Sequence, residues 1–418
     1  MPIISFVCLL ILLFNLISGL RKNADFLSPG RVFTMLWAFV IGLVEFKFSR
    51  LQFQWSSFGW FIALLGLVTF LMGAYISNVI NLDKPLLSIS EIKVRIKESG
   101  INERFLYRFI IFYFVLYLIC YFIEWQVEGY IPFFTSLPDK ARKLFGIFGV
   151  HLIVVGVNIV LFLIIQYFIF VKSNISKKIF LAFIFLITAG SFFLLMQRYN
   201  FMMLILMSFC LFYYSGKKIK LKTLIIFGSI VFALVISVQT LRTTELITAY
   251  IILYSKMKIP SSYAAFAIPY MYVAMNLENF VKIFPTIENH TYGFFTFDFL
   301  TALTGIKHWI ADTYNLDRFK DYIAGYNTFP FYWSYYYDFG YMGLAIIPFA
   351  LGFIFSEIYM HLRRNPNLVT LSLYTIVFAV ITISYTSDPL TRLDMMFNFT
   401  IIVLVQFLIR NKASLRSN

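Results

Sequence analysis

Charged residues are scarce in this chain: Asp, Glu, Lys and Arg make up 13% of its 418 residues. A soluble domain has about 25% charged and about 45–50% apolar residues. Here 60% of the residues are apolar and the mean hydropathy is +0.81. These proportions exclude a water-soluble fold and indicate a membrane protein.

The sequence also lacks the signatures of soluble enzymes and of metal sites. It contains no Walker loop and no G-x-G-x-x-G, G-x-S-x-G or H-E-x-x-H motif. Its three cysteines lie singly in apolar stretches, so neither a disulfide framework nor a zinc site is expected. Asp312, Asp317 and Asp321 are too widely spaced for a strong ligand set. We therefore expect chemistry that needs no cofactor and no metal.

Long apolar runs are what the sequence has in abundance, and about 20 such residues cross a bilayer as a helix. They predict an all-α fold, a polytopic membrane helical bundle of about eleven transmembrane helices, or thirteen if residues 241–340 cross twice. The expected spans are 2–20, 32–46, 58–80, 105–124, 147–171, 179–197, 201–214, 223–240, 341–362, 368–385 and 395–409. We predict three parts: transmembrane helices in 1–240, a large external loop with interfacial helices in 241–340, and transmembrane helices with a tail in 341–418.

The basic residues indicate the orientation of the chain. The net charge of +15 does not predict nucleic-acid binding, because Lys and Arg form short clusters between apolar runs rather than one patch. Of the 35 basic residues, 20 lie in 21–31, 81–104, 172–178, 215–222, 363–367 and 410–418, which are alternate connections and the tail. Since basic loops remain in the cytoplasm, we expect the N-terminus outside and the C-terminus in the cytoplasm.

Arginines on the external side run against this rule, which makes them candidates for binding an anion. They are Arg142, Arg198, Arg242, Arg318 and Arg392. Residues 179–214 predict a hairpin whose tip, Gln197–Asn200, lies at or below the headgroups. A planar guanidinium there matches phosphate oxygens in pairs. A lipid headgroup or a nearby carboxylate remains an alternative partner, and for Arg392 this is Asp388 or Asp394.

Aromatic residues are concentrated at the end of the long loop, where Tyr322–Tyr341 holds eleven in twenty residues. An interfacial belt of rings explains part of this run. Stacking on sugar rings explains it equally well, with polar groups bonding the hydroxyls. The candidate sugar-binding residues are Asn327, Tyr332, Trp333, Tyr336 and Tyr337. By contrast, we interpret Glu124 as an interfacial residue and His151 as a residue that hydrogen-bonds neighbouring helices.

The same run carries a family resemblance. It reads Tyr326-Asn327-Thr328-Phe329, then Tyr335-Tyr336-Tyr337-Asp338-Phe339-Gly340-Tyr341-Met342-Gly343. It resembles the end of the large external loop in O-antigen and exopolysaccharide repeat-unit polymerases. The layout of ten to fourteen helices, with a long outer loop in the C-terminal half, is similar over most of the chain.

The resemblance implies a membrane-embedded glycosyltransferase of the bacterial inner membrane. It would transfer a growing chain from undecaprenyl diphosphate to the next lipid-linked oligosaccharide on the periplasmic face. A chain-length-determining co-polymerase, a repeat-unit flippase and membrane lipids are the implied partners. An O-antigen ligase, which uses the same donor, remains an alternative. A flippase is a second one, although it should show charges lining the middle of the membrane, which are nearly absent here.

A mechanism follows from the charge changes in glycosyl transfer, which builds negative charge on the departing diphosphate. We expect Arg198 and Arg242 to stabilise this leaving group in place of a metal, with Arg142, Arg318 and Arg392 binding substrate. A carboxylate would take the proton of the acceptor hydroxyl, and a single displacement would invert the anomeric centre. Asp338 is the first candidate for this base, although it can equally cap a helix. Asp312 and Glu245 remain alternatives.

Overall fold

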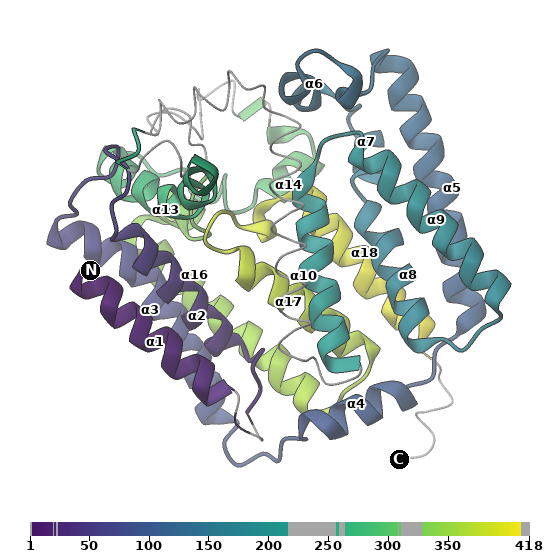
Figure 1. Cartoon of the computed structure of the whole chain (residues 1–418), viewed down its shortest axis with the longest axis horizontal. Coiled ribbons are helices and arrows are strands. Elements are labelled where there is room, and N and C mark those ends of the chain that lie inside the picture. The colour runs from purple at the N-terminus through teal and green to yellow at the C-terminus, as the bar shows by residue number, and fades with distance from the viewer. Residues whose placement is uncertain are drawn as a thin grey trace. The chain divides into compact units, whose positions relative to one another are not determined.

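The computed structural model describes residues 2–19, 21, 24–215, 256–258, 264–307, 309–310 and 328–410. The chain divides into two compact units (Figure 1). The first unit comprises residues 1–86, 245–361 and 380–396, and the second comprises 87–244, 362–379 and 397–418. Three of the helices named below, α16, α17 and α18, contribute residues to both units.

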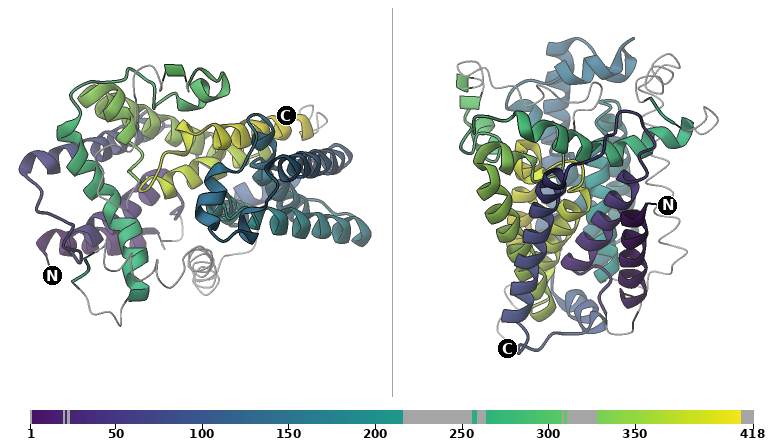
Figure 2. Two further views of the ribbon diagram at one scale, coloured as in Figure 1. Left: turned by 90° about the horizontal axis from the view of Figure 1, so that it is seen from above. Right: turned by 90° about the vertical axis from the view of Figure 1, so that its left-hand side faces the viewer.

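The first unit is built on helices from both halves of the sequence. Its elements are α1 (Ile3–Gly19), α2 (Pro29–Val44), α3 (Ser57–Ile80), α13 (Ala264–Ile283), η3 (Phe284–Thr286), α14 (Asp298–Leu303), most of α16 (Trp333–Arg364) and η4 (Pro389–Thr391). Helices α1 and α2 lie side by side in Figure 1 and Figure 2. Helix α13 packs against α2 and α3, so a helix of the predicted external loop belongs to the core of this unit.

The second unit contains the helices of the middle of the chain. They are α4 (Ile89–Glu98), α5 (Glu103–Glu128), η1 (Pro132–Phe134), α6 (Pro138–Leu144), α7 (Val150–Val154), α8 (Val157–Phe170), α9 (Ile175–Phe193), α10 (Arg198–Ser215), most of α17 (Leu368–Ile383) and most of α18 (Leu393–Ile409). Helix α8 is buried along most of its length and packs against α5, α9 and α10. It therefore forms the core of this unit.

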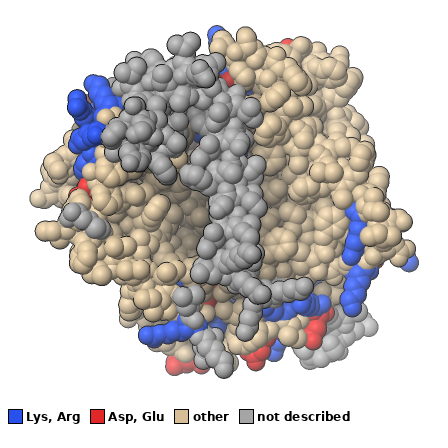
Figure 3. All heavy atoms as spheres, in the orientation of Figure 1, with Lys and Arg blue, Asp and Glu red and all other residues tan. Residues whose placement is uncertain are grey.

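The prediction of an all-α polytopic membrane bundle is confirmed. Five described helical segments are long and apolar enough to cross a membrane, and α1, α2, α17 and α18 are shorter apolar helices. Among the described residues there is no β-strand. Every expected span overlaps a described helix except 223–240, which lies outside the described residues. Uncharged residues form most of the face drawn in Figure 3, as expected for a surface in contact with lipid.

Two glycines allow α3 and α16 to approach within contact of their backbones. A Cβ atom on Gly73 would lie 2.0 Å from the carbonyl oxygen of Phe349, and one on Gly352 would lie 2.0 Å from that of Phe70. No side chain fits at such distances. Small residues are the usual means of bringing membrane helices together, because lipid supplies no hydrophobic force to do so.

Helix α16 contains the predicted span 341–362, and the aromatic residues before that span extend the helical segment back to Trp333. The helix breaks at Gly340, whose φ of 58° and ψ of −140° suit glycine alone. A Cβ atom there would also lie 2.8 Å from Nε2 of His290. A single glycine thus lets an aromatic helix turn into the next apolar span.

Candidate functional site

The predicted hairpin is present in the second unit. Helix α9 ends at Phe193 and α10 begins at Arg198, as the sequence spacing indicated. The connection includes Met196 in a left-handed conformation with φ of 59°. The carbonyl oxygen of Leu194 accepts a hydrogen bond of 3.0 Å from the amide of Phe133. Arg198 is therefore the first residue of α10, at the tip of a hairpin that η1 holds in place.

A carboxylate and an imidazole meet beside this tip. The side chain of Glu124, on α5, is 0% exposed, and its two oxygens lie 3.0 and 3.1 Å from Nδ1 of His151 on α7. The backbone amide of Ile147 donates to the same carboxylate at 3.2 Å. On the other side of the ring, Nε2 of His151 lies 3.2 Å from the side-chain nitrogen of Gln197. Arg198 follows Gln197 in the sequence, so its backbone lies close to the pair.

The position of the His151 ring depends on two nearby glycines. A Cβ atom on Gly146 would lie 2.7 Å from Cγ and Nδ1 of the His151 ring, and its φ of 127° is one that side chains rarely adopt. Gly149, with φ of 80°, precedes α7. From the sequence, Glu124 and His151 each have a structural explanation, and nothing in the spacing predicts that they contact each other. The sequence signal that could have revealed their contact is the pair Gly146 and Gly149, which flank a short connection just before His151.

Arg142 lies on α6, close in sequence to the connection just described. Its Nε atom is 2.9 Å from the carboxylate of Asp139, which also lies 3.4 Å from Nζ of Lys143. Burial raises the pKa of Asp139, but the positive charges of Arg142 and Lys143 outweigh it and hold that pKa below its usual value. The guanidinium of Arg142 is thus partly neutralised by its own helix.

Arg392 belongs to the first unit and forms a paired contact with Asp394. Its Nε atom lies 3.1 Å from Oδ1 and its Nη2 atom 2.8 Å from Oδ2 of that residue. This is the carboxylate partner that the sequence left open. Arg242 and Arg318 lie outside the described residues. The convergence of several arginines on one anion therefore stays a prediction.

Asp338, the predicted base, is wholly buried on α16 in the first unit. Its carboxylate accepts hydrogen bonds from the hydroxyl of Thr291 and from the amides of Phe295, at 3.2 Å, and Thr296, at 2.5 Å. Its carbonyl oxygen accepts from the amide of Tyr292. The residue thus fixes the loop that leads into α14. Its role as a base stays a prediction.

The predicted sugar-binding aromatics are packed among other aromatic side chains. Tyr332, Trp333 and Tyr336 are at most 5% exposed, and the hydroxyl of Tyr332 donates to the carbonyl oxygen of Ala63. The ring of Tyr337 lies 4.9 Å from that of Trp333 and 4.7 Å from that of Phe295. Of the four rings, Tyr337 is the one that keeps partial exposure. Asn327 lies outside the described residues, and sugar binding by this group stays a prediction.

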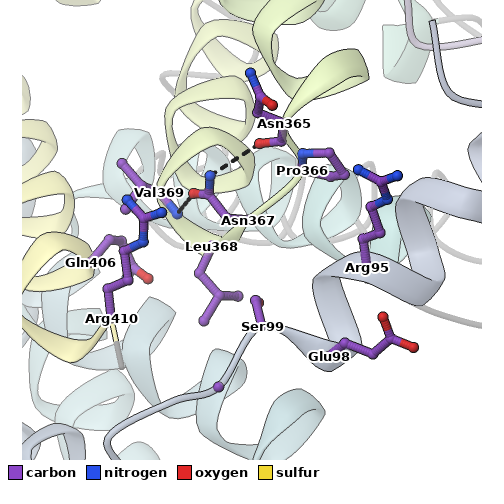
Figure 4. Close-up of a pocket in the computed structure, with 11 residues that line it drawn as sticks. Arg95, Glu98, Ser99, Asn365, Pro366, Asn367, Leu368, Val369, Gln406 and Arg410 are labelled. Atoms are coloured by element: carbon purple, nitrogen blue, oxygen red, sulfur yellow. Dashed lines mark hydrogen bonds between the residues drawn. The ribbon is translucent and has the colours of Figure 1, made fainter. Parts of the chain in front are cut away.

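A polar cavity in the second unit is lined by the end of α4, the start of α17 with the residues before it, and the end of α18 (Figure 4). Its volume is about 520 Å³, and its lining includes Arg95, Glu98, Asn365, Asn367 and Arg410. Asn367 uses its side chain locally, accepting from the amide of Val369 and donating to the carbonyl oxygen of Asn365. None of the predicted site residues lines this cavity.

Metal ligands are not grouped in the part of the chain that the structure describes. There, no three His, Cys, Asp or Glu side chains lie close enough to hold one ion. The pair Glu124–His151, with Gln197, is a described group of polar side chains that suits proton transfer.

These features define a polytopic membrane protein whose ionisable groups cluster at helix ends and at the tip of a hairpin. The family model for O-antigen polymerases matches residues 2–397, and the chain belongs to that family. No curated protein and no solved structure shows significant similarity to the chain. The family match confirms the resemblance seen in the sequence, and with it a role in polysaccharide biosynthesis at a membrane.

Proposed function

We propose that this protein polymerises undecaprenyl-diphosphate-linked oligosaccharide repeat units into O-antigen or exopolysaccharide. The growing chain leaves its lipid diphosphate and is joined to the next lipid-linked unit on the periplasmic face of the bacterial inner membrane. The observation that carries this proposal is the family match over almost the whole chain, from residue 2 to 397. The position of Arg198 at a hairpin tip supports it.

The proposed mechanism assigns the arginines to the diphosphate. A diphosphate leaving group gains negative charge as the glycosidic bond breaks, and fixed guanidinium groups stabilise that charge without reorganisation. Arg198 and Arg242 have this role, while Arg142, Arg318 and Arg392 hold the substrate. In this mechanism no metal ion is required, and a single displacement inverts the anomeric centre.

We assign sugar binding to the aromatic helix of the first unit. Tyr332, Trp333, Tyr336 and Tyr337 form the wall of this subsite, with Asn327 at its start, and Tyr337 presents the accessible ring. Flat rings stack on pyranose faces. The N-terminus is external and the C-terminus cytoplasmic in this proposal, and the protein works with a chain-length-determining co-polymerase and a repeat-unit flippase.

Purified protein with a defined undecaprenyl-diphosphate oligosaccharide tests the proposal. We expect a ladder of lipid-linked products spaced by one repeat unit, equally intense with and without EDTA, and an anomeric configuration inverted relative to the donor. A ladder that disappears with EDTA would overturn the metal-free mechanism. Transfer to a lipid A core acceptor without any ladder would assign the protein as a ligase instead.

A further inference from the structure

We propose that Glu124 and His151 form the proton-accepting pair of this enzyme, with His151 as a catalytic residue and Glu124 as its positioning residue. This inference rests on the proposed function and gives the step of proton removal a location in the second unit. It assigns to His151 the proton of the acceptor hydroxyl that is otherwise predicted for Asp338.

The first support is the burial of Glu124. Its side chain is 0% exposed, at the end of an apolar helix, and a carboxylate without partners there would be costly. Its described partners are Nδ1 of His151 and the amide of Ile147. Of these two partners, only the imidazole can bind an additional proton, because the backbone amide already carries its hydrogen and can only donate it. Through this contact the carboxylate orients the ring of His151.

The second support is the tautomer that these contacts require. A carboxylate accepts, so Nδ1 of His151 carries the hydrogen that points to Glu124. The side-chain nitrogen of Gln197 donates, so Nε2 accepts from it at 3.2 Å. Nε2 is thus the basic nitrogen, and it faces the hairpin tip. This is the arrangement in which a carboxylate orients an imidazole for proton removal.

The third support is the path from the pair to solvent. Glu124 is fully enclosed, whereas the side chain of His151 is 25% exposed. Gly146 leaves room for the ring, because any side chain there would strike it. The amide of Gln197 occupies the place beside Nε2 that an acceptor hydroxyl would take in this reaction. Rotation of this amide would free Nε2, and Arg198, the next residue, would then lie beside the reacting groups.

The proposed reaction is a single displacement at the anomeric carbon with His151 as the base. The acceptor hydroxyl gives its proton to Nε2 of His151 while its oxygen forms a bond to the anomeric carbon of the donor chain. The bond between that carbon and the diphosphate oxygen breaks, and its electron pair leaves on the diphosphate, whose charge Arg198 stabilises. The imidazolium is held by Glu124 until it loses its proton to water.

The test compares single variants of the purified protein in the ladder assay. We expect His151→Ala to lower kcat by about 10²–10⁴-fold, the usual share of general base catalysis, with KM for the donor within about threefold of the original. Glu124→Gln keeps an acceptor oxygen toward Nδ1 but cannot stabilise the imidazolium, so its kcat should fall with little change in KM. His361→Gln, at an exposed histidine of α16, is the matched control and should keep the original rate.

Added imidazole separates catalysis from folding. It should restore part of the rate of His151→Ala, because the base that the variant lacks is supplied in solution, and leave His361→Gln unchanged. An unaltered kcat in His151→Ala would overturn the inference, and so would a loss that imidazole does not restore in a variant with the original melting temperature. Failure of the unaltered protein to make any ladder would instead contradict the proposed function.

Discussion

Nζ of Lys47 lies 2.7 Å from Oε1 of Glu278, which is 0% exposed on α13 in the first unit. The second oxygen of Glu278 accepts from the indole of Trp55 at 3.0 Å, and Gln52 donates to the first at 3.3 Å. The connection between α2 and α3 is thus tied to α13 through a single buried carboxylate. Removing one partner of a buried ion pair leaves an uncompensated charge, which costs about 3–5 kcal/mol.

We therefore expect Lys47→Met to lower the melting temperature of the purified protein strongly. Lys140→Met, at an exposed lysine of α6, should leave it unchanged. Circular dichroism during heating in detergent measures both. Equal melting temperatures for the two variants would show that the contact contributes no net stability.

The close approach of α3 and α16 gives a second prediction. Gly73→Ala forces a methyl group into the backbone of α16, and overpacking of this kind costs about 1–3 kcal/mol or more. Gly190→Ala is the matched control, since a Cβ atom on this helical glycine meets nothing within 4 Å. Alanine favours a helix over glycine by about 0.5–1 kcal/mol, so this control should melt at the same temperature or higher. The reverse order would contradict the packing described here.

Helices could be predicted from the sequence where an apolar run of span length is the dominant pattern. Apolar runs of span length and the spacing between them predicted the hairpin of α9 and α10 to within a few residues of its ends. The predicted span 341–362 follows the break in α16, but the burial of the aromatic run before it could not be predicted, because its packing partners are distant in the sequence. Tyr332 contacts α3 through Ala63, which lies 269 positions away in the sequence.

The candidate site was predictable only in part, for the same reason. Arg198 stood out because an arginine at a short hairpin tip violates the charge rule of membrane loops. Glu124 and His151 did not stand out, because each has an ordinary structural explanation when it is considered alone. Their pairing depends on the left-handed turns at Gly146 and Gly149, which bring two separate helices together.

Asp338→Asn distinguishes the two assignments of the base. The amide keeps one acceptor oxygen but turns its NH2 group toward the backbone amide of either Phe295 or Thr296, so about 1–3 kcal/mol of stability should be lost. With His151 as the base, kcat of the folded fraction should stay within about tenfold of the original. Glu288→Gln is the control, because Glu288 is an exposed carboxylate just before the loop that Asp338 binds. A fall of more than a hundredfold at an unchanged melting temperature would return the role of base to Asp338.

Arg198 should matter to turnover more than the other described external arginines. Arg392 and Arg142, which lie 2.8 and 2.9 Å from a neighbouring carboxylate, are assigned to substrate binding, so their loss should act mainly on KM. Arg198 follows the residue that contacts His151, so its loss should act on the departing diphosphate. Removing one group that stabilises transition-state charge typically costs about 10²–10³-fold in kcat.

The series Arg198→Lys and Arg198→Ala measures this role. Lysine keeps the charge without the planar fork, and we expect an intermediate kcat, whereas alanine should show the full loss. Arg95→Ala is the control, since this arginine lines the cavity beside α4 (Figure 4), and α4 lies at the other end of the second unit from α7 (Figure 1). All variants should be present in the membrane at equal amounts, measured by immunoblot. If Arg198→Ala still makes long polysaccharide at the original rate, guanidinium stabilisation at the hairpin tip is not part of the reaction, and the diphosphate must be held elsewhere in the chain.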